Sequence, residues 1–565
     1  MVKTALANPD VLDRIPLSAR AVLEIGCGGG ATLAAYRARN PTCTLFGIEV
    51  DPDDANLAAQ HLDHVVTADP EERLAPFGAQ RFDCIVYDGS LARMREPWRV
   101  LAAHAKLLNP DGMVVICVPN VEHWSFTQRL LTGSFSYRPN GLFDQHHLRW
   151  FTLESMQTTL TECGLHPFDV VGRVFDREAA QGFAAQIAPA LEALGIEASI
   201  YIRRATPLQY VWRATAAAMA RMQVVSTMLE PVGGVSDVRV LQPMQALGRE
   251  SGLDIHIIDD REFPRVADDS PRIFIFHRPC LAGESGLAML RGILALGYVT
   301  VCEFDDHPDY LPVLQRDDLL NFTGVHAVQT STPALAAVLG QRNPNIAVFP
   351  NAIDSLDPPR NFTNPERLTL FFGGINREHE WRDLMPALNE VLREAGPKLF
   401  VRVVADQGFF DALQTQHKSF TPLCDYAAYR HMLAESEISL MPLRDIAFNR
   451  CKSDLKFLEA AAARCVALAS PTVYANTIRH GQTGLVFTSP DMLRDSLRAV
   501  LANPLWAQGL ADAARADISK HRMLAHQMAA RQAWYRSLWE RRDALTRALA
   551  IRVPELYVQN NNSSQ

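Results

Sequence analysis

The sequence contains no uninterrupted run of about 18 apolar residues, and its first residues, MVKTALANPDVLDR, lack an apolar core. A membrane-spanning helix needs about 20 consecutive apolar residues, and a secretory signal peptide needs such a core. We therefore expect a cytoplasmic protein that neither spans nor crosses a membrane. Any contact with a membrane would be peripheral.

Clustered cations and paired cysteines are also missing. The net charge is −8, and Lys and Arg form no long block, so nucleic acid is not an expected partner. The ten cysteines include no C-x-x-C pair, and Cys84, Cys117 and Cys302 lie within apolar runs. This pattern indicates buried thiols in a reducing compartment rather than a disulfide framework.

Strand-like and helix-like runs alternate along most of the 565 residues, a length that accommodates about three domains. The alternation predicts α/β domains with mostly parallel sheets and ligands at the carboxyl ends of the strands. Residues 176–221, rich in Ala, Gln and Arg, predict a helical linker. Arg213 and Arg221 would share one face of it, either solvated or against a membrane surface. The polar tail, 551–565, is predicted to be disordered.

A glycine loop follows the first strand-like run, in the sequence VLEIGCGGG at residues 22–30. Gly26, Gly28 and Gly30 would let backbone N–H groups approach a ligand, and a helix starts directly afterwards. The loop therefore predicts a nucleotide-cofactor site. Gly26, Gly28 and Ala31 also satisfy the dinucleotide pattern G-x-G-x-x-G/A, so the loop by itself leaves NAD or a simple tight turn open.

Carboxylates stand at or near the ends of the first four strand-like runs. Glu24 precedes the glycines, and Glu49 closes the next strand, where it can accept both hydroxyls of a ribose. Asp69 follows the third strand, at the expected level of an adenine edge. Asp88 ends the fourth.

With these residues, and with EPWRVL, PNVEHW and GLFDQHHLRWFT, residues 20–170 resemble the class I S-adenosylmethionine-dependent methyltransferases of surface-polysaccharide synthesis. The resemblance implies S-adenosylmethionine as cofactor of a domain at 1–175. No second mononucleotide half follows, which disfavours NAD.

Residues 119–152 are dense in polar and aromatic groups, and the methyl acceptor is expected there. His147 or Asp144 would be the general base. The alternative is a cover loop whose His and Arg side chains cap helices and pair with Asp144. A metal site at His146 and His147 is disfavoured because adjacent side chains diverge and no Cys or Glu completes a set. No metal is expected.

Relatives carry Leu-Glu-His after the fourth strand, where this chain has Ala92 and Arg93 in place of Glu and His. This departure motivates an alternative in which the N-terminal domain only binds cofactor or serves as a scaffold.

Residues 222–550 resemble glycosyltransferases of GT-B architecture. The resemblance is carried by GGVSDVRV, PNAID, FFGGINREHEWRDL, NRCKSDLKFLEAAAARCVALAS and HGQTGLVF. It implies a Rossmann-like methyltransferase domain followed by two further Rossmann-like parallel sheets: an acceptor lobe at 222–355 and a donor lobe at 356–517. It also implies a C-terminal helix at 518–550 that crosses back to the first lobe, and a metal-independent, retaining reaction.

The donor site is expected at the start of the helix SDLKFLEAAAA. Lys452, Ser453, Lys456 and helix N–H groups would bind the diphosphate of a nucleotide sugar. By resemblance, Glu459 accepts ribose hydroxyls, and Asn449 belongs to a variant N-x-x-K-S motif. Alternatively, Lys456 and Glu459 form only an exposed i, i+3 pair.

Other candidate residues lie at strand ends in both lobes. Arg377 would bind phosphate or cap a helix. Asp305 and Asp306 would orient the acceptor or stabilise positive charge at the anomeric carbon, or else act as N-caps. The acceptor-side candidates are Gly233, Gly234, His277 and Arg278.

The leading hypothesis is a bifunctional enzyme of bacterial surface-glycan synthesis. It would transfer a sugar from a nucleotide sugar, and a methyl group from S-adenosylmethionine, to a glycan or lipid-linked glycan. A third hypothesis, besides the scaffold alternative, is a non-catalytic glycan-binding or assembly protein. It is motivated by Cys451, which stands where the GT-B resemblance implies a Glu.

Overall fold

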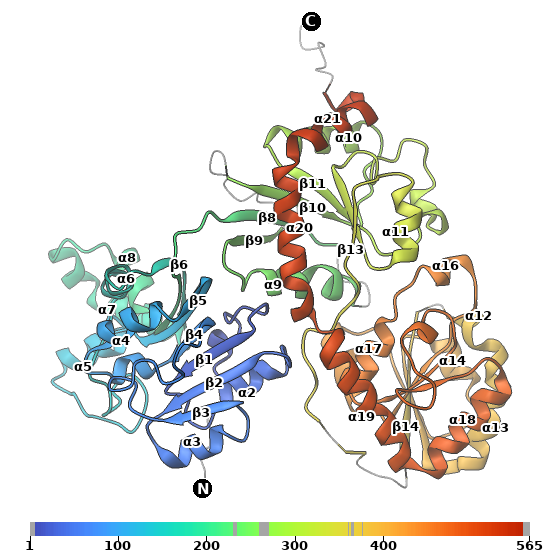
Figure 1. Ribbon diagram of the computed structural model, residues 1–565, viewed down its shortest axis with the longest axis horizontal. Helices are drawn as coiled ribbons and strands as arrows, with labels where there is room; N and C mark the ends of the chain where they lie inside the picture. The colour runs from blue at the N-terminus through green and yellow to red at the C-terminus, as the bar shows by residue number, and fades with distance from the viewer. Residues whose placement is uncertain are drawn as a thin grey trace, which may run out of the picture. The chain divides into compact units, whose positions relative to one another are not determined.

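A computed structural model describes residues 6–229, 234–258, 270–359, 361–362, 367–375 and 377–557. The chain divides into two compact units (Figure 1): Met1–Ala220 with Arg249–Gly252, and Arg221–Gly248 with Leu253–Gln565. The first unit holds one sheet and the second holds two. All three sheets are mainly parallel and carry helices, so the predicted α/β class is confirmed.

The sheet of unit 1 has seven strands in the order β3-β2-β1-β4-β5-β7-β6. The strands are β1 (Ala21–Ile25), β2 (Thr44–Glu49), β3 (His64–Thr67), β4 (Phe82–Asp88), β5 (Leu108–Pro119), β6 (His166–Arg173) and β7 (Gln209–Thr215). Only β7 runs antiparallel to its neighbours. Every residue of β1 is buried, as expected of a central strand that is covered on both faces.

Helices of unit 1 flank this sheet and bury two apolar clusters against it. They are α1 (Pro9–Leu12), α2 (Ala31–Arg37), α3 (Pro52–Ala58), α4 (Pro97–Ala105), α5 (Trp124–Leu131), α6 (Leu153–Glu162), α7 (Arg177–Ala193) and α8 (Ala198–Ala205). Loops at the carboxyl ends of β1, β2 and β4 carry the residues of the first candidate site.

The predicted helical linker at 176–221 is wrong in its second half. Helices α7 and α8 exist, but QYVWRAT forms β7, which lies between β5 and β6. Arg213 therefore belongs to the sheet, and its Nε donates to Asp169 at 2.8 Å. The following AAAMA run favoured a helix locally, whereas burial between two strands decides the conformation of this segment. Unit 1 consequently extends to Ala220 rather than ending at 175.

Unit 2 begins with a first lobe, which we define by its six-stranded parallel sheet in the order β13-β12-β11-β10-β8-β9. Its strands are β8 (Met222–Thr227), β9 (Leu253–Ile258), β10 (Arg272–His277), β11 (Val299–Glu303), β12 (Ala327–Thr330) and β13 (Ile346–Val348). Its helices are α9 (Gln242–Leu247), α10 (Gly283–Ala295) and α11 (Pro333–Gly340).

The second lobe is built on another six-stranded parallel sheet, in the order β16-β15-β14-β17-β18-β19. Its strands are β14 (Leu368–Gly373), β15 (Leu399–Val404), β16 (Lys418–Thr421), β17 (Ile438–Met441), β18 (Val466–Ala469) and β19 (Leu485–Val486). Its helices are α12 (Glu378–Trp381), α13 (Met385–Ala395), α14 (Gln407–Ala412), α15 (Tyr426–Ala434), α16 (Ala447–Arg450), α17 (Leu455–Ala462), α18 (Pro490–Ala502) and α19 (Pro504–His521). Strand β16 was not predicted, because its short, half-buried KSFT sequence carries little apolar signal.

After α19 the chain returns to the first lobe. Helix α20 (Met528–Glu540) runs beside β10 and α9 (Figure 1), and α21 (Arg542–Arg552) follows it. The hydroxyl of Tyr535 donates to Gln329 of β12 at 3.0 Å. The stretch 518–550 is thus not one helix. Residues 551–557 are ordered, contrary to the prediction, because Val553 and Leu556 join the apolar cluster of the first lobe, and the rest of the tail lies outside the described residues.

Within the described parts of the chain, no helix is both long and apolar enough to cross a bilayer.

Candidate functional site

The glycine loop of unit 1 connects the end of β1 to the start of α2. Gly26, Gly28 and Gly30 have φ values of 69°, 51° and 79°, the left-handed region that favours glycine. A Cβ on Gly26 would lie 2.7 Å from Ser90 Cβ, and one on Gly30 would lie 2.4 Å from Leu62 Cδ1. Gly28 instead has no atom within 4 Å of such a Cβ, so this residue faces open space where a ligand can approach.

Glu49, at the end of β2, holds this loop. Its Oε2 accepts a hydrogen bond from Gly28 N at 2.7 Å, and its Oε1 accepts from Val50 N at 2.8 Å and Asp51 N at 3.1 Å. A carboxylate offers about four acceptor positions, so one remains for a ligand hydroxyl. The sequence indicated only the ligand role, because backbone donors leave no trace in a residue pattern.

Two further carboxylates converge on the loop. Glu24 is buried, and its Oε2 has no hydrogen-bond partner among the described residues. Burial raises the pKa of Glu24, and the nearby charges of Asp88 and Glu49 raise it further. Burial also raises the pKa of Asp88, whose Oδ1 accepts from Asn8 Nδ2 at 2.7 Å. This group of acids would be stabilised by a positively charged ligand.

Asp69 follows β3 as predicted, but its carboxylate already has partners. It accepts from Glu71 N at 2.8 Å and lies 3.5 Å from Arg95. Glu71 accepts from the backbone of Arg95 and Glu96, so these acids also anchor the turn after β4.

The segment expected to cover the methyl acceptor is tied to the turn after β4. Leu148 N and Arg149 N donate to the carbonyl of Ala92 at 2.8 and 2.9 Å. Arg93 Nη2 lies 2.9 Å from the buried carboxylate of Asp144. Ala92 and Arg93, which stand in place of the Glu and His of the Leu-Glu-His pattern, therefore fix this segment in place. The pairing of Asp144 with an Arg agrees with the cover-loop alternative.

Asp144 and His147 differ in protonation chemistry. Burial alone would raise the pKa of Asp144, but the His146 N–H and the charge of Arg93 lower it below its usual value. The pKa of His147 is lowered by burial, and its Nδ1 lies 3.5 Å from Leu142 O. Near neutral pH, His147 is therefore uncharged and able to accept a proton, whereas Asp144 is held as an anion.

In the described residues, no group of three or more His, Cys, Asp or Glu side chains is arranged to hold a metal ion.

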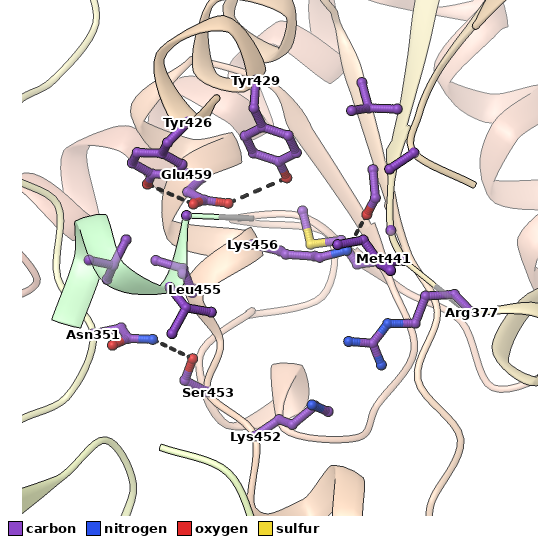
Figure 2. A pocket seen from close by; sticks show the side chains of 18 of the residues that line it. Asn351, Arg377, Tyr426, Tyr429, Met441, Lys452, Ser453, Leu455, Lys456 and Glu459 are labelled. Carbon is purple, nitrogen blue, oxygen red and sulfur yellow. Dashed lines mark hydrogen bonds between the residues drawn. The ribbon is translucent and has the colours of Figure 1, made fainter. Parts of the chain in front are cut away.

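Unit 2 contains a cavity of about 370 Å³ between its two lobes. Figure 2 shows side chains of both lobes pointing into it. Candidate residues of the first lobe that line it are Gly234, Arg278, Asp305 and Asp306, and those of the second lobe are Arg377, Lys452, Ser453, Lys456 and Glu459.

Three cations of the second lobe meet at this cavity. Lys456 Nζ donates to the carbonyl of Gly373, at the end of β14. Burial lowers the pKa of Lys456 to about 8, and the positive charges of Arg377 and Lys452 contribute to the shift. Lys456 and Glu459 are not an exposed pair, since Glu459 is buried and Lys456 partly so. The alternative that Lys456 and Glu459 form only an exposed i, i+3 pair is therefore wrong.

The two aspartates after β11 form ion pairs instead of capping a helix. Arg278 Nε lies 2.6 Å from Asp305 Oδ1, and its Nη2 lies 2.9 Å from Asp306 Oδ2. Lys452 of the second lobe approaches Asp306 to 3.3 Å. Burial alone would raise the pKa of Asp305, but Arg278 lowers it. The N-cap alternative is therefore wrong for both residues.

Asn351, in the PNAID crossing, connects the lobes at the cavity. Its Nδ2 donates to Ser453 Oγ at 2.7 Å, and its Oδ1 accepts from Arg239 Nη1 at 2.8 Å. Arg239 also pairs with Glu303 at 2.8 Å, and both side chains are 1% exposed. The first lobe thus fixes the hydroxyl of Ser453 through a buried polar chain.

Glu459 accepts two tyrosine hydroxyls of α15 (Figure 2). Tyr426 donates to its Oε1 at 2.7 Å and Tyr429 to its Oε2 at 3.5 Å. Burial raises the pKa of Glu459, against the charge of Arg430 and the hydrogen bond of Tyr426. The sequence analysis missed both tyrosines. Their i, i+3 spacing in DYAAYR before Arg430 is the signal that would have grouped them.

Two predicted residues that the structure describes, Asn449 and His277, do not line the cavity. Asn449 is buried, and its Nδ2 donates to Glu380 Oε1 and to Arg444 O, both at 2.9 Å. His277 is also buried, its Nδ1 accepts from Leu229 N at 3.3 Å, and burial lowers its pKa to about 4. Gly233 lies outside the described residues.

Cys451, which replaces the Glu implied by the GT-B resemblance, packs in the apolar cluster of the first lobe. Its carbonyl accepts from Thr332 Oγ1 at 2.9 Å. A carboxylate at this position would be desolvated among apolar side chains, so the residue has a packing role here.

Comparison with known families divides the chain in the same way as the fold. Residues 5–168 match the family described as a methyltransferase domain, and residues 386–533 match the family described as glycosyl transferase-like. The chain thus joins an N-terminal methyltransferase domain to a C-terminal glycosyl transferase-like domain, which confirms the methyltransferase and glycosyltransferase parts of the two resemblances.

The chain is similar to the ubiquinone biosynthesis O-methyltransferases of Neisseria meningitidis and Cereibacter sphaeroides. Identity to the Neisseria protein is 30% over 149 residues, which is 24% of this chain and 62% of the relative. Identity to the Cereibacter protein is 26% over 174 residues, or 30% of this chain and 68% of the relative. This chain therefore spans less than two thirds of the Neisseria relative.

Solved structures with similar folds are remote in sequence. Anabaena HepE, in complex with UDP and glucose, has 11% identity and a TM-score of 0.39, covering 55% of this chain and 99% of its own. Staphylococcus aureus TarM has 11% identity and a TM-score of 0.37, covering 47% of this chain and 55% of its own.

Proposed function

We propose that unit 2 transfers a sugar from a nucleoside-diphosphate sugar to a glycan. The observation that carries this proposal is the cation cluster of Lys452, Lys456 and Arg377 in a cavity that also contains the buried carboxylate of Glu459. Lys456 precedes Glu459 on α17, so a diphosphate on the cations and a ribose on the carboxylate would follow the order of these two residues along the helix.

The three cations have few anionic partners: Lys452 pairs with Asp306 and Arg377 lies 3.9 Å from Glu380, while Lys456 donates to a neutral carbonyl. Burial and mutual repulsion lower the pKa of Lys456, so its charged form is destabilised until an anion binds. A leaving diphosphate supplies that negative charge, and charge-assisted hydrogen bonds would stabilise it as it develops. This arrangement supports leaving-group neutralisation by side chains, hence the proposal of a metal-independent reaction.

Asp305 and Asp306 line the same cavity from the first lobe, and Asp306 lies 3.3 Å from Lys452. Both pair with Arg278, which lowers the pKa of Asp305, and they could stabilise positive charge that develops at the anomeric carbon, or orient the acceptor hydroxyl. We propose that the acceptor binds on this side of the cavity, which Gly234 also lines. We expect the transferred sugar to retain its anomeric configuration.

Calorimetry of the full chain with UDP, GDP, ADP, CDP and dTDP tests the donor site. Lys456→Ala should weaken binding of the preferred nucleotide, whereas the exposed-surface control Lys520→Ala should not. If no nucleoside diphosphate binds the parent protein, the proposal fails. NMR of the product of a positive reaction then assigns the anomeric configuration.

We further propose that unit 1 binds S-adenosylmethionine in its glycine loop. The acids Glu24, Glu49 and Asp88 fit the positive charge and the ribose of this cofactor, and Gly28 leaves room for it. When bound, S-adenosylmethionine supplies an electrophilic methyl group. Neutral His147 would accept the proton of a glycan hydroxyl, and Asp144 would position the covering segment.

Because the two domains share one chain, we propose that both act on the same bacterial surface glycan, free or lipid-linked, in the cytoplasm. Transfer of a labelled methyl group from S-adenosylmethionine to the glycosylated product tests this link. Methylation of the acceptor without any dependence on prior glycosyl transfer would contradict it.

A second candidate for unit 1 is cofactor binding without methyl transfer. The Arg93–Asp144 pair favours it, because the pair removes one of the two expected bases from proton transfer. Binding of S-adenosylhomocysteine without methyl transfer to any glycan product would support this alternative.

A further inference from the structure

The two tyrosines of α15 contact the same carboxylate in different ways. Their rings are stacked, with centroids 6.2 Å apart and planes at 12°, and both hydroxyls point to Glu459 (Figure 2). The Tyr426 hydroxyl donates to Glu459 Oε1 at 2.7 Å, a short hydrogen bond. The Tyr429 hydroxyl lies 3.5 Å from Oε2, which is the longest distance at which a hydrogen bond is counted. The pair therefore provides one strong and one weak donor on neighbouring turns of a single helix.

Glu459 depends on these neutral donors because the nearby cations have other partners. Lys456 donates to the Gly373 carbonyl, and Arg430 Nη2 donates to Asp357 at 2.8 Å. The charges of Arg430 and Lys456 still act on the carboxylate over distance. A buried carboxylate needs direct hydrogen bonds in addition, and Tyr426 supplies the shortest one found in the described residues.

The ring of Tyr426 is fixed from the other lobe. Gly234, at φ 84°, lies so close that a Cβ on it would be 2.5 Å from Tyr426 Cδ2. The ring thus packs directly on the backbone of the first lobe while its hydroxyl reaches Glu459 of the second. Any shift of this ring would move the hydroxyl away from the carboxylate.

We propose that Tyr426 is a positioning residue that turns Glu459 toward a donor ribose and thereby makes the site selective for ribose over deoxyribose. This inference rests on the proposed donor function. The hydroxyl of Tyr426 takes one acceptor position of Oε1, which leaves the other position of Oε1 and the weakly occupied Oε2. Two adjacent acceptor atoms match the two vicinal hydroxyls of a ribose.

Tyr426→Phe tests the proposal, because it keeps the ring against Gly234 and removes only the hydroxyl. The matched control is Tyr429→Phe, which removes the weaker donor from the same helix. The probes are the nucleoside diphosphate that binds the parent best, from the five named above, and its 2′,3′-dideoxy analogue. The measured quantity is the ratio of their dissociation constants.

We expect Tyr426→Phe to reduce the preference for the ribose form by about 5- to 10-fold, the effect of one misdirected hydrogen bond. Tyr429→Phe should change the preference by less than about 2-fold, because its hydroxyl makes the longer contact. The affinity for the dideoxy analogue should be the same in all three proteins.

The pH dependence of this ratio gives a readout that a loss of packing would not change. Taking the ratio cancels the titration of the phosphates, which both probes share. The groups that face Glu459 are Arg430, Lys456, Tyr426, Tyr429 and Tyr474. Without the Tyr426 donor the carboxylate protonates at higher pH, so the ribose preference should disappear at a higher pH in Tyr426→Phe than in the parent.

An unchanged ratio in Tyr426→Phe would overturn the inference, as would an equal loss of affinity for both probes. If the parent itself shows no ribose preference, or if Glu459→Gln leaves that preference intact, the assignment of Glu459 to the ribose is wrong, and the failure belongs to the proposed function.

Discussion

The guanidinium of Arg93 lies 2.9 Å from the carboxylate of Asp144, and the two side chains are exposed to very different degrees, 57% against 2%. The pair connects the turn after β4 to the segment that covers the proposed methyl-acceptor site. Arg93 therefore compensates a buried charge from the solvent side, which explains why this position carries a cation.

Arg93→Ala should destabilise unit 1 by about 1 to 2 kcal/mol, because it leaves a buried carboxylate without its cation. The pKa of Asp144 is lowered in the folded protein, so its contribution to stability is present at neutral pH and is lost as the pH falls through the folded pKa. In the variant this pKa is higher, so the loss begins at a higher pH. Urea unfolding at a series of pH values measures the free energy of unfolding of each protein, and the exposed Arg138→Ala serves as control. Identical curves for both variants would contradict this role.

Glu49→Ala should weaken S-adenosylhomocysteine binding by roughly 1 to 3 kcal/mol, because one hydroxyl donor of the ligand and the Gly28 N–H lose their acceptor. Calorimetry of the full chain measures the change. Asp53→Ala, which removes an exposed carboxylate of α3, serves as control. Unchanged affinity in Glu49→Ala, or binding of NADH by the parent, would sink the cofactor assignment.

Lys456→Ala and Glu459→Ala should each weaken nucleoside diphosphate binding, the former by about 1.5 to 3 kcal/mol for a lost charge-assisted hydrogen bond. S-adenosylhomocysteine binding should not change, because that site lies in the other unit. Parent-like nucleotide titrations for both variants would place the donor elsewhere.

The pKa of Lys456, lowered to about 8 mainly by burial, predicts a pH limit for donor binding. Its charged form is lost as the pH rises through that value, so nucleotide affinity should fall between about pH 7 and pH 9. Lys456→Arg stays charged over this range and should show a flatter profile. Equal slopes for parent and variant would exclude Lys456 as the titrating group.

His147→Ala should abolish most methyl transfer while leaving S-adenosylhomocysteine binding intact, since a positioned base contributes about 100-fold or more. His146→Ala is the matched control on the neighbouring residue. Rates are measured with labelled S-adenosylmethionine and the glycosylated product. Full activity of His147→Ala would remove this residue from the mechanism.

The parts of the fold set by local sequence were predictable. The glycine loop, the strands that end at Glu49 and Asp88, and the start of α17 follow from short-range patterns of apolar residues and glycines. Strand β7 was not predictable, because its antiparallel place between β5 and β6 depends on partners distant in the chain. Its neighbour β6 was missed for the same reason.

The candidate donor site was predicted in its charges but not in its neutral contacts. Lys452 and Lys456 could be grouped because they flank the start of one helix, α17. Tyr426 comes from another helix and meets Glu459 only after the second lobe has folded. Asn449 was misplaced because a motif specifies residue order and not side-chain direction, and its amide turns inward to Glu380.

The return of the chain to the first lobe has a consequence for synthesis on the ribosome. The apolar cluster of that lobe includes Leu549, Val553 and Leu556, so it is incomplete until residue 556 has been translated. The cluster of the second lobe is drawn from residues 362–511 and is finished earlier. Although domains usually fold in the order in which they emerge, here the earlier lobe must wait for the later one. We therefore expect the nascent first lobe to expose apolar surface for longer than the second lobe during synthesis.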